Sequence, residues 1–540
     1  MWPIILFPIG CNGVSTDPRL KRNETYGWWV WLAIALCIPA FVINIDNVPF
    51  IGDEAIRAIV AYEMMLSGNY LVPKINGEFY FSKPPLYNWV LICFYRVFGV
   101  VSELSSRIPT VIFTVLFTYV IYLFNKRRFI FKKHSVLLAL MFLTCGRMIF
   151  YDSFLGLIDI FFSMVTYTMI IGTYVLASKD KWQQAYFLMC ILSAVGFMLK
   201  GLPTIHFFIF NILCLHITLG QWKKIMSWGM VAGFLTGGLL LGTYFFFYNN
   251  YITAKDAMAP LLEEAAIRTV AKNEWSDVFK HILTYPFENI YHFLPWSIFG
   301  ILAIRKDIVA ILKSNKYIWY CTLSALTNYM VYWTSAEVFP RYILMLIPLI
   351  FTIWIFLYEF EVQDHHWRLK TLRILFKGIA FTIPFVIALG IFNSKIDLIA
   401  YWEIKMLIIV SILALVSYYY FVNQPLRPIL LVIMILVLRI GFDIFVLPVR
   451  AMNRDSVVVK SESIRIAKTY GPNIKIYGSS SMNRVNSIYM MMENEAILSH
   501  DSSMTLAPYY IIDSTYLENF NTIDTFPNGE GATMWVIEAQ

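Results

Sequence analysis

The chain has 540 residues, of which 59% are hydrophobic and only 14% are charged. An ordinary soluble protein carries about 25% charged residues, so this composition excludes that class. The net charge of +8 does not indicate a nucleic-acid partner, because the basic residues gather in short loops between apolar runs. Seven cysteines without a CxxC pair give no sign of a disulfide framework or a zinc ribbon.

Repeated apolar runs, each long enough to cross a bilayer, predict an all-α polytopic membrane protein. Positions 86–99 are also apolar, but the stretch is short, follows Pro84-Pro85 and contains Arg96. We interpret it as an interfacial helix that lies on the membrane surface within the first outer loop. This leaves 13 predicted spans, at 28–45, 106–124, 135–151, 156–176, 183–200, 203–219, 226–247, 290–304, 316–335, 341–358, 374–393, 403–421 and 428–447.

The loops between these spans predict an orientation. With the N-terminus inside, every dense basic cluster falls on the inner side, as the positive-inside rule requires. Counting 86–99 as a span would place the cluster 125-NKRRFIFKKH-134 outside. The model with 13 spans therefore places the first loop and the C-terminal tail on the outer side. We predict a transmembrane domain at 1–447 and an outward-facing soluble domain at 448–540.

The tail differs in character from the rest of the chain. Short β-rich runs at 474–478, 508–513 and 534–538 are separated by Ser, Asn and Gly, and 461–470 reads as a helix. This pattern predicts a small α/β domain.

Asp53 and Glu54 are the first candidates for chemistry, because they stand next to each other in apolar sequence. A carboxylate held at the membrane surface can act as a general base toward an acceptor hydroxyl. The alternative is structural: acidic residues favour the N-terminus of a helix, and Gly52 before the pair with Arg57 after it fits that reading.

Asp152 and Asp159 are the next acidic pair, in 151-YDSFLGLIDIFF-162. Ionisable groups inside an apolar run are costly and indicate function. Their spacing of seven residues places both on one helix face if the helix extends back to Asp152. The structural alternative is a buried ion pair with Arg147 or with a cation of another span.

Three cations accompany these acids on the predicted outer side. Lys83 is followed by two prolines, Lys200-Gly201 ends a span, and Arg341 follows Pro340. Each can hold a phosphate as a point charge, and each can equally be an interfacial anchor. His281 and His292 show no metal-ligand spacing, so we read them as ordinary loop histidines.

The order of these motifs resembles a known family. An acidic pair follows the first span, then come 68-GNYLVPKINGEFYFSKPPLYNW-89, 98-FG-99, 106-SRIPT-110, an Asp just inside a span, Lys-Gly at a span end, 295-PW-296 and Pro-Arg-Tyr before another span. Over roughly residues 45–350 the chain looks like the GT-C glycosyltransferases that use lipid-linked sugars, related to bacterial aminoarabinose transferases and protein O-mannosyltransferases.

The resemblance implies roles for individual residues. Asp53 resembles the acidic residue at the reacting centre, with Glu54 and Arg57 supporting it. Asp159 resembles the second acidic residue, and Asp152 is a rival for that match. The remaining matches resemble contacts to the donor phosphate and substrate, and they are Lys83, Lys200, Arg268, Arg341 and Tyr342.

One departure from the family concerns metal. Aminoarabinose-transferring members usually have Glu where this chain has Ser82, and that glutamate is linked to a bound metal there. With Ser82 in its place we carry over no metal site and predict no cofactor. A divalent metal has no support in the sequence, and the departure also weakens a specific prediction of transfer onto lipid A.

The resemblance implies an inverting transfer of sugar from a polyprenyl phosphate, such as undecaprenyl phosphate, to a hydroxyl or phosphate of a lipid, glycan or protein. It implies the bacterial inner membrane, with the active site and the tail on the periplasmic face. The main alternative is a transporter or flippase of lipid-linked sugars, which typically shows inverted repeats and charges near the midplane. A scaffold that only presents the tail domain is the second alternative.

Overall fold

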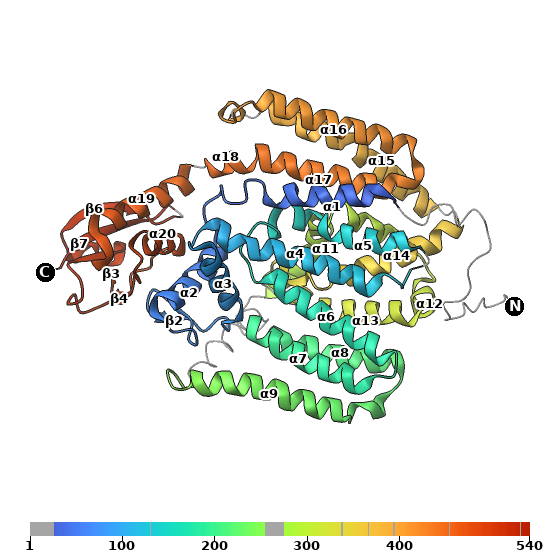
Figure 1. Cartoon of the computed structure of the whole chain (residues 1–540), viewed down its shortest axis with the longest axis horizontal. Helices are drawn as coiled ribbons and strands as arrows, with labels where there is room; N and C mark the ends of the chain where they lie inside the picture. Colours follow the sequence, from blue (N-terminus) through green and yellow to red (C-terminus); the bar gives the residue numbers. More distant parts are fainter. Residues whose placement is uncertain are drawn as a thin grey trace.

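The computed structural model describes residues 26–129, 131–253, 275–335, 338–364, 367–392, 395–452, 454–529 and 531–539. This part of the chain is largely helical, and a small sheet lies near its C-terminus (Figure 1). The helices of the main body are α1 (Trp28–Val42), α2 (Asp53–Ser67), α3 (Leu86–Phe98), α4 (Glu103–Asn125), α5 (Lys132–Leu143), α6 (Asp159–Ala177), α7 (Trp182–Lys200), α8 (Pro203–Leu219), α9 (Trp228–Tyr248), α11 (Trp275–His292), α12 (Ile308–Lys313), α13 (Lys316–Trp333), α14 (Ile347–Asp364), α15 (Trp367–Ala388), α16 (Trp402–Val422), α17 (Arg427–Phe445) and α18 (Leu447–Ala451).

Seven helices in the described ranges are long and apolar enough to cross a membrane. They are α4, α6, α7, α9, α15, α16 and α17, of which α9, α15 and α17 are counted together with short helical segments next to them. The predicted class of a helical polytopic membrane protein is therefore confirmed. Each of the other predicted runs also coincides with helical segments, among them the shorter α1 and α8, while the count of 13 spans stays a prediction.

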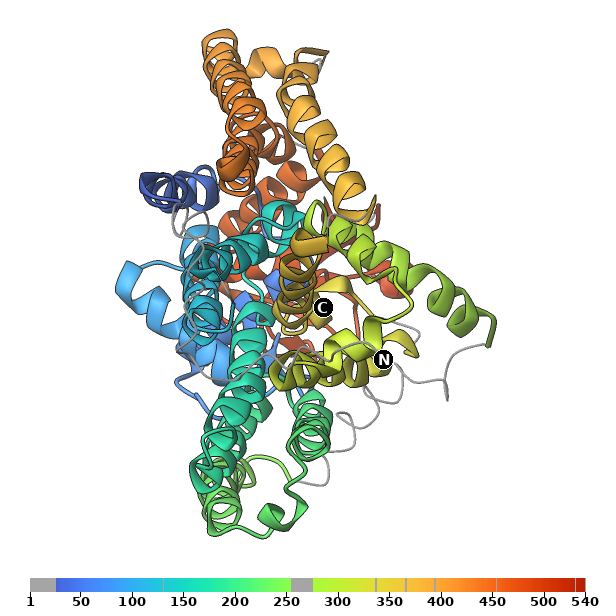
Figure 2. The ribbon, with the colours of Figure 1, turned by 90° about the vertical axis from the view of Figure 1, so that its right-hand side faces the viewer.

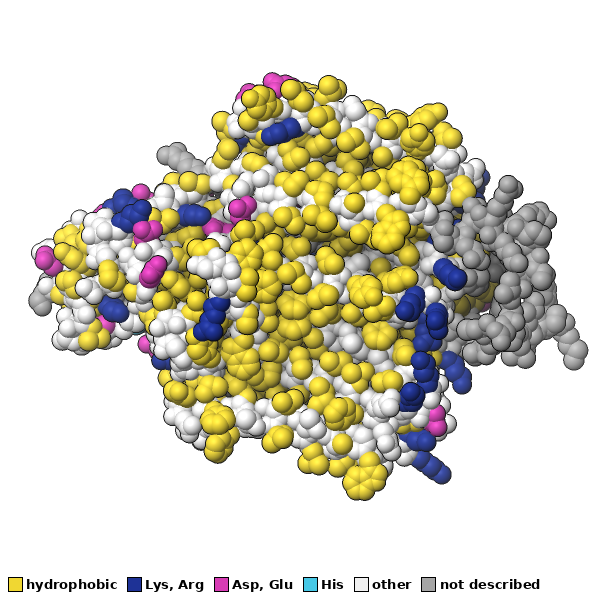
Figure 3. Space-filling view, viewed as in Figure 1, with side chains coloured by type: hydrophobic (Ala, Val, Ile, Leu, Met, Phe, Trp, Pro, Cys, Tyr) yellow, Lys and Arg dark blue, Asp and Glu magenta, His cyan; other side chains and the backbone are white. Residues whose placement is uncertain are grey.

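The bundle has an inner part and two outer edges. α6 and α17 are buried along most of their length, whereas only about a quarter to a third of the apolar windows of α9, α15 and α16 is buried. Figures 1 and 2 show α9 at one edge of the bundle and the α15–α16 pair at the opposite edge. Apolar side chains cover the face of the molecule between these edges (Figure 3). A surface of this kind is favourable in lipid and costly in water.

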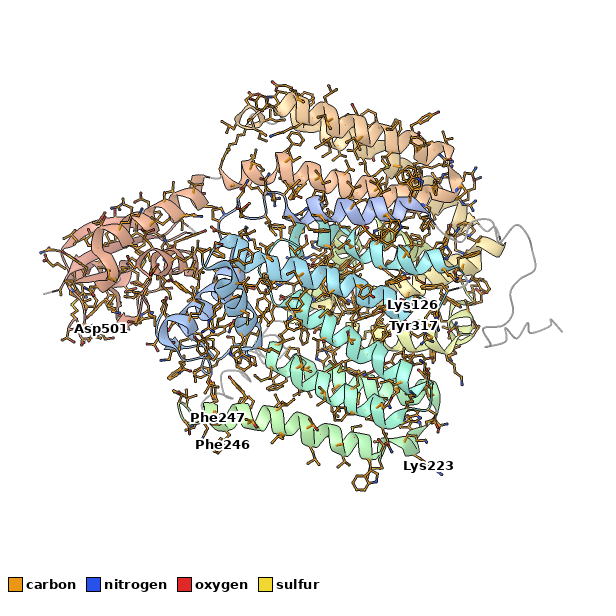
Figure 4. The ribbon with its side chains drawn as sticks, viewed as in Figure 1. Lys126, Lys223, Phe246, Phe247, Tyr317 and Asp501 are labelled. Atoms are coloured by element: carbon orange, nitrogen blue, oxygen red, sulfur yellow. The ribbon has the colours of Figure 1, made fainter. Side chains whose placement is uncertain are left out.

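Charge separates the two ends of the bundle. Lys and Arg side chains gather at the end opposite the C-terminal sheet (Figure 3). Lys126 and Lys223 lie at this basic end, and Asp501 lies at the far side of the molecule (Figure 4). The grouping of basic loops predicted from the sequence is thus present in space, while the assignment of this end to the cytoplasm stays a prediction.

The segment between α1 and α4 forms a compact cap on the bundle. Gly52 takes a positive φ of 50° before α2, and Gly68 ends that helix with φ 69°. A two-stranded hairpin of β1 (Lys74–Ile75) and β2 (Glu78–Phe79) follows. Pro84 and Pro85 precede α3 directly, because a proline ring suits the start of a helix and not its interior. The helix predicted at 86–99 is confirmed as α3.

The tail forms an α/β unit, as the sequence predicts. Its helices are α19 (Arg454–Tyr470) and α20 (Arg484–Asn494). Its five strands lie in the order β4 (His500–Asp501), β3 (Ile474–Tyr477), β5 (Tyr509–Ile512), β7 (Thr533–Glu538) and β6 (Thr522–Pro527). β3 is parallel to β4 and β5, and β7 is antiparallel to β5 and β6. The boundary at residue 447 stays a prediction.

This unit packs on the cap through buried polar contacts. The Tyr489 hydroxyl donates to Glu103 at 2.6 Å and accepts from the Phe50 N–H at 3.0 Å. Lys460 forms an ion pair with the same Glu103 at 2.6 Å. On the hairpin, the Asn76 amide donates to the Ser487 hydroxyl at 3.1 Å. These bonds fix the tail against the segment that carries Asp53.

Glu63 is a buried carboxyl on the cap, next to this contact. Its side chain accepts from the Gly77 N–H at 3.0 Å through Oε1, and Oε2 has no hydrogen-bond partner in the described part of the chain. Burial raises the pKa of Glu63 from about 4.5 to about 7, and the Gly77 N–H and Lys74 offset part of that rise.

We expect the pKa of Glu63 to make stability depend on pH. Glu63 holds its proton more tightly in the folded state than in the unfolded state. Its contribution to the free energy of unfolding is therefore fully present below about pH 4.5 and is lost as the pH rises to about 7. The wild type should lose about 2–3 kcal/mol between pH 5 and pH 8. Glu63→Gln should remove this dependence and melt higher than the wild type at pH 8.

The measurement is the thermal unfolding midpoint of purified protein across this range. Glu78→Gln on the β1–β2 hairpin, where the side chain is exposed, is the matched control. The Glu78 charge is the smallest contribution to the raised pKa of Glu63, so this variant should keep most of the wild-type pH dependence. A Glu63→Gln variant that is less stable than the wild type at pH 8 would contradict the assignment.

Candidate active site

A buried ion pair between Arg107 and Glu54 holds the cap on the bundle. Arg107 Nε and Nη2 donate to the two Glu54 carboxylate oxygens at 2.7 and 2.8 Å. Both side chains are fully buried. A carboxylate accepting two parallel bonds from one guanidinium is among the stronger ionic contacts in proteins.

The remaining donors of Arg107 fix the loop before α2. Nη1 donates to the carbonyl oxygens of Ile45 and Val48 at 2.7 and 2.8 Å, and Nη2 to that of Pro49 at 3.1 Å. Glu54 also accepts from the Gly156 N–H at 2.8 Å. A side chain at Gly156 would meet the Ser106 carbonyl oxygen at 2.8 Å, so only glycine allows this approach. The pair therefore joins three separate segments around the start of α2.

Asp53 lies next to the Arg107–Glu54 ion pair, and its side chain faces outward. Its side chain is 53% exposed, although Arg341 Nη2 donates to its Oδ2 at 2.5 Å. The fixed first turn of α2 buries Glu54 and turns the neighbouring Asp53 toward solvent. The two residues begin a helix, as the structural reading expected, and Asp53 remains accessible. The reading of Asp53 as a general base stays a prediction.

Arg341 links Asp53 to a second carboxylate. Asp159, the first residue of α6, lies 3.6 Å from Arg341 Nε and accepts from Lys200 Nζ at 2.5 Å. The side chains of Asp159, Lys200 and Arg341 are 7%, 5% and 12% exposed. An alternating row of two acids and two cations therefore joins α2, α6, the end of α7 and the turn before α14.

Asp152 belongs to a separate ion pair. Arg147 donates to both of its oxygens, at 2.7 and 2.9 Å, and both side chains are buried. The condition for Asp152 and Asp159 to share one helix face is not met, because α6 begins at Asp159 and Asp152 ends the π-helical turn Met148–Asp152. The pairing with Arg147, weighed from the sequence as the structural alternative, is confirmed. Burial raises the pKa of Asp152, and the Arg147 guanidinium offsets part of that rise.

Further cations surround Asp159. Arg57 of α2 interacts electrostatically with Asp159, and its Nη2 donates to the Tyr80 hydroxyl at 2.6 Å. The charges of Lys83 and Lys200 also interact. Lys83 Nζ donates to the Ser82 carbonyl at 2.8 Å.

Two guanidinium donors at this site are buried without a hydrogen-bond partner in the described ranges. They are Arg57 Nη1 and Arg341 Nε. Tyr342 lies under this group of cations, with Lys200 Nζ 4.1 Å and the Arg341 guanidinium carbon 5.5 Å from its ring centroid. Buried donors that lack an acceptor cost free energy, and an anionic ligand would provide one.

The structure thus brings together Asp53, Asp159, Arg57, Lys83, Lys200, Arg341 and Tyr342. Glu54 lies beside them but is buried under Arg107, and Arg268 lies outside the described residues. His281, which the sequence predicts to be an ordinary loop histidine, contacts the Tyr332 carbonyl oxygen. Sequence reasoning gave no role to Arg107 and Tyr80, although both fall inside the motifs quoted above.

The residues at this site do not fit a metal ion. Ser82, at the position of the family's glutamate, offers only a hydroxyl, and its carbonyl accepts from Lys83. In the described part of the chain no three His, Cys, Asp or Glu side chains form a group that could hold one. Cations already pair with both carboxylates of the row, Asp53 and Asp159.

Comparison with known proteins agrees with this architecture. A family model described as dolichyl-phosphate-mannose-protein mannosyltransferase matches residues 82–241. The undecaprenyl phosphate-alpha-4-amino-4-deoxy-L-arabinose arabinosyl transferase of Edwardsiella ictaluri is 26% identical over 207 residues, 38% of this chain and 37% of that one. An uncharacterized protein of Aquifex aeolicus is 23% identical over 278 residues, 50% and 53% of the two chains. The matched regions thus span about half or less of these relatives.

The fold has a solved counterpart. The crystal structure of ArnT from Cupriavidus metallidurans bound to undecaprenyl phosphate has a TM-score of 0.66 to this chain. The match covers 95% of this chain and 98% of that one at 17% identity, so it establishes the fold. Together these matches confirm the resemblance predicted from the sequence: the chain is similar to ArnT in its fold and, over the matched regions, to the aminoarabinose transferases and the mannosyltransferase family model.

The Arg107–Glu54 pair should be essential to the folded state. Arg107→Met leaves a carboxylate buried without its partner and frees three loop carbonyls, and we expect a loss of about 3–5 kcal/mol. The thermal unfolding midpoint of purified protein measures this. Arg96→Met, which removes an exposed arginine that donates to Tyr70, should change stability far less.

A double-mutant cycle isolates the pair itself. Arg107→Met combined with Glu54→Gln should be more stable than the sum of the two single losses by about 2 kcal/mol. Strict additivity would show that the two side chains do not act as a unit.

Proposed function

We propose that this protein is an inverting glycosyltransferase that moves a sugar from a polyprenyl phosphate, such as undecaprenyl phosphate, to an acceptor hydroxyl or phosphate. The observation that carries the proposal is the cation cluster with unused buried donors. Arg57 Nη1 and Arg341 Nε make no hydrogen bond in the described ranges, although Arg341 Nε lies 3.6 Å from Asp159, and both side chains interact electrostatically with Asp159. A donor phosphate would satisfy them.

The leaving group explains the excess of cations. When the bond between the anomeric carbon and the phosphate oxygen breaks, negative charge grows on the lipid phosphate. Fixed positive groups stabilise that charge in the transition state more than in the ground state. Arg57, Lys83, Lys200 and Arg341 take this role, and a separate acid to protonate the leaving oxygen is unnecessary.

Asp53 is the best candidate for the base. The acceptor oxygen attacks the anomeric carbon from the side opposite the phosphate, and the carboxylate takes its proton. Asp53 is about half exposed, whereas Asp152 and Asp159 are buried in ion pairs. Arg341 orients Asp53 through their ion pair, and Asp159 holds Arg341 and Lys200 in position. Asp159 is thus a positioning residue in this scheme, and Asp152 holds the adjacent turn.

The membrane setting supports a lipid-linked donor. Apolar side chains cover the bundle (Figure 3), and the site lies where α6 begins and α7 ends. Both Edwardsiella and Cupriavidus relatives are named for undecaprenyl phosphate or were solved with it. We infer that the site faces the periplasm of a bacterial inner membrane, because α2, which begins at Asp53, lies at the end of the bundle away from the clustered Lys and Arg side chains (Figures 1 and 3).

A transfer assay tests the proposal. Purified protein receives a mixed pool of polyprenyl-phosphate sugars with hydroxyl and phosphate acceptors, and released polyprenyl phosphate is measured. We expect turnover by the wild type. Asp53→Asn should lower it by about 10²–10⁴-fold because the base is lost, and Arg341→Gln by about 10²–10³-fold because charge stabilisation is lost.

Asp46→Asn is the matched control, since Asp46 is an exposed acid of the same loop, and it should retain full turnover. Full turnover by folded Asp53→Asn would refute its role and make Asp152 or Asp159 the candidate base. Movement of donor lipid across vesicles without release of polyprenyl phosphate would show a transporter.

A further inference from the structure

A second site lies at the basic end of the bundle, away from the acids and cations described above. A partly open cavity of about 140 Å³ is lined by residues of α5, α14, α15, α16, α17 and the 3₁₀ segment Trp296–Ala303. Tyr358 of α14 is one of its lining residues. Because α14 begins at Ile347, just after the turn that carries Arg341, and rises 1.5 Å per residue, Tyr358 lies about 16 Å along the helix from its start. The cavity is therefore well separated from the candidate active site.

The walls of this cavity are apolar and aromatic. Trp296, Phe299, Phe376 and Tyr420 line it and are almost fully buried, and Leu431 closes it from α17. Pockets that hold a whole drug-sized molecule measure about 300–1,000 Å³. This cavity is smaller, so it can take only part of a ligand, and its walls suit a stretch of hydrocarbon chain.

Two arginines are the charged groups in the lining. Arg373 of α15 is exposed and Arg427, the first residue of α17, is half-buried. Arg427 donates to the carbonyl oxygens of Tyr420 and Phe421 at 3.1 and 3.3 Å, which fixes it beside the cavity. Since a guanidinium has five N–H donors, most of its donors remain available to a phosphate.

The location selects the kind of ligand. Arg427 begins α17, and the other end of that helix leads through α18 to the C-terminal unit (Figure 1), so the cavity lies at the basic end of the bundle. α15 and α16, which form one wall, expose apolar side chains on the outer edge of the molecule. Basic pockets between transmembrane helices on the cytoplasmic side are suited to anionic lipid headgroups.

We propose that this cavity is a binding site for an anionic phospholipid, with the phosphate held by Arg373 and Arg427 and part of one acyl chain among the aromatic walls. The bound lipid joins the outer helices α15 and α16 to α5 and α14 of the inner bundle. It is a structural ligand, separate in place and chemistry from the donor of the proposed sugar transfer.

The test compares lipids on delipidated, detergent-purified protein. Dioleoyl phosphatidylglycerol is titrated, and binding is followed by native mass spectrometry and by the thermal unfolding midpoint. Dioleoyl phosphatidylcholine, glycerol phosphate and undecaprenyl phosphate are titrated alongside. We expect phosphatidylglycerol to bind and to raise the midpoint, and the other three to do so far more weakly.

Two variants and a matched control identify the site. Arg373→Gln with Arg427→Gln should weaken the binding of phosphatidylglycerol about 30-fold, because each cation near an anionic lipid contributes about 1 kcal/mol. Leu431→Phe, which fills the cavity, should weaken the binding of phosphatidylglycerol and leave the binding of glycerol phosphate unaffected. Lys126→Gln with Lys223→Gln removes two exposed charges from the same end (Figure 4) and should change nothing.

Four results would overturn the proposal. Equal binding of phosphatidylglycerol by the arginine variant and the wild type would show that the cavity is not the site. Equal stabilisation by glycerol phosphate would show a free-phosphate site, and stronger binding of undecaprenyl phosphate would assign the cavity to the donor lipid. An equal loss in the lysine control would show that overall charge, and not a site, attracts the lipid.

Discussion

The bidentate pair of Arg107 and Glu54 is the contact on which the rest of the site depends. An ionised pair without solvent exposure is costly unless every donor and acceptor is satisfied. Here Arg107 also binds three loop carbonyls, and Glu54 also accepts the Gly156 N–H. Because this one contact joins the loop before α2, the start of α4 and the turn before α6, the positions of Asp53 and Asp159 relative to each other follow from it.

The row of charges beside the Arg107–Glu54 pair can hold a fixed geometry only in surroundings of low dielectric constant. In water, four groups such as Asp53, Arg341, Asp159 and Lys200 would interact weakly, because exposed ion pairs contribute little. With three of the four nearly buried, their mutual attraction holds each in one geometry. A site prearranged in this way needs little reorganisation when an anionic ligand enters, which is the physical condition for stabilising charge in a transition state.

The C-terminal unit takes part in this arrangement instead of being a separate appendage. Tyr489 and Lys460 both contact Glu103 at the start of α4, four residues before Arg107. Asn76 and Ser487 tie the hairpin to α20. The cap that carries Asp53, Arg57 and Lys83 is therefore in contact with the bundle on one side and with the C-terminal unit on another. Contacts of this kind restrict the cap without covering Asp53.

The sequence by itself determined the membrane class, the interfacial helix after Pro84-Pro85, the strands and helix of the tail, and most members of the charged cluster. These follow from local signals: apolar length, proline position, period-two alternation, and ionisable residues in apolar surroundings. The family motif added which acids and cations belong together.

Pairing was decided only by the tertiary structure. Neither spacing nor composition shows that Arg341 joins Asp53 to Asp159 or that the chain is not one helix between Asp152 and Asp159, and the sequence left the pairing of Asp152 with Arg147 as one of two alternatives. Glu54 and Asp53 are adjacent and chemically alike, yet one is buried under Arg107 and the other is exposed. The reason is physical: a salt bridge between residues 53 positions apart depends on how the helices pack, and no local pattern encodes that packing.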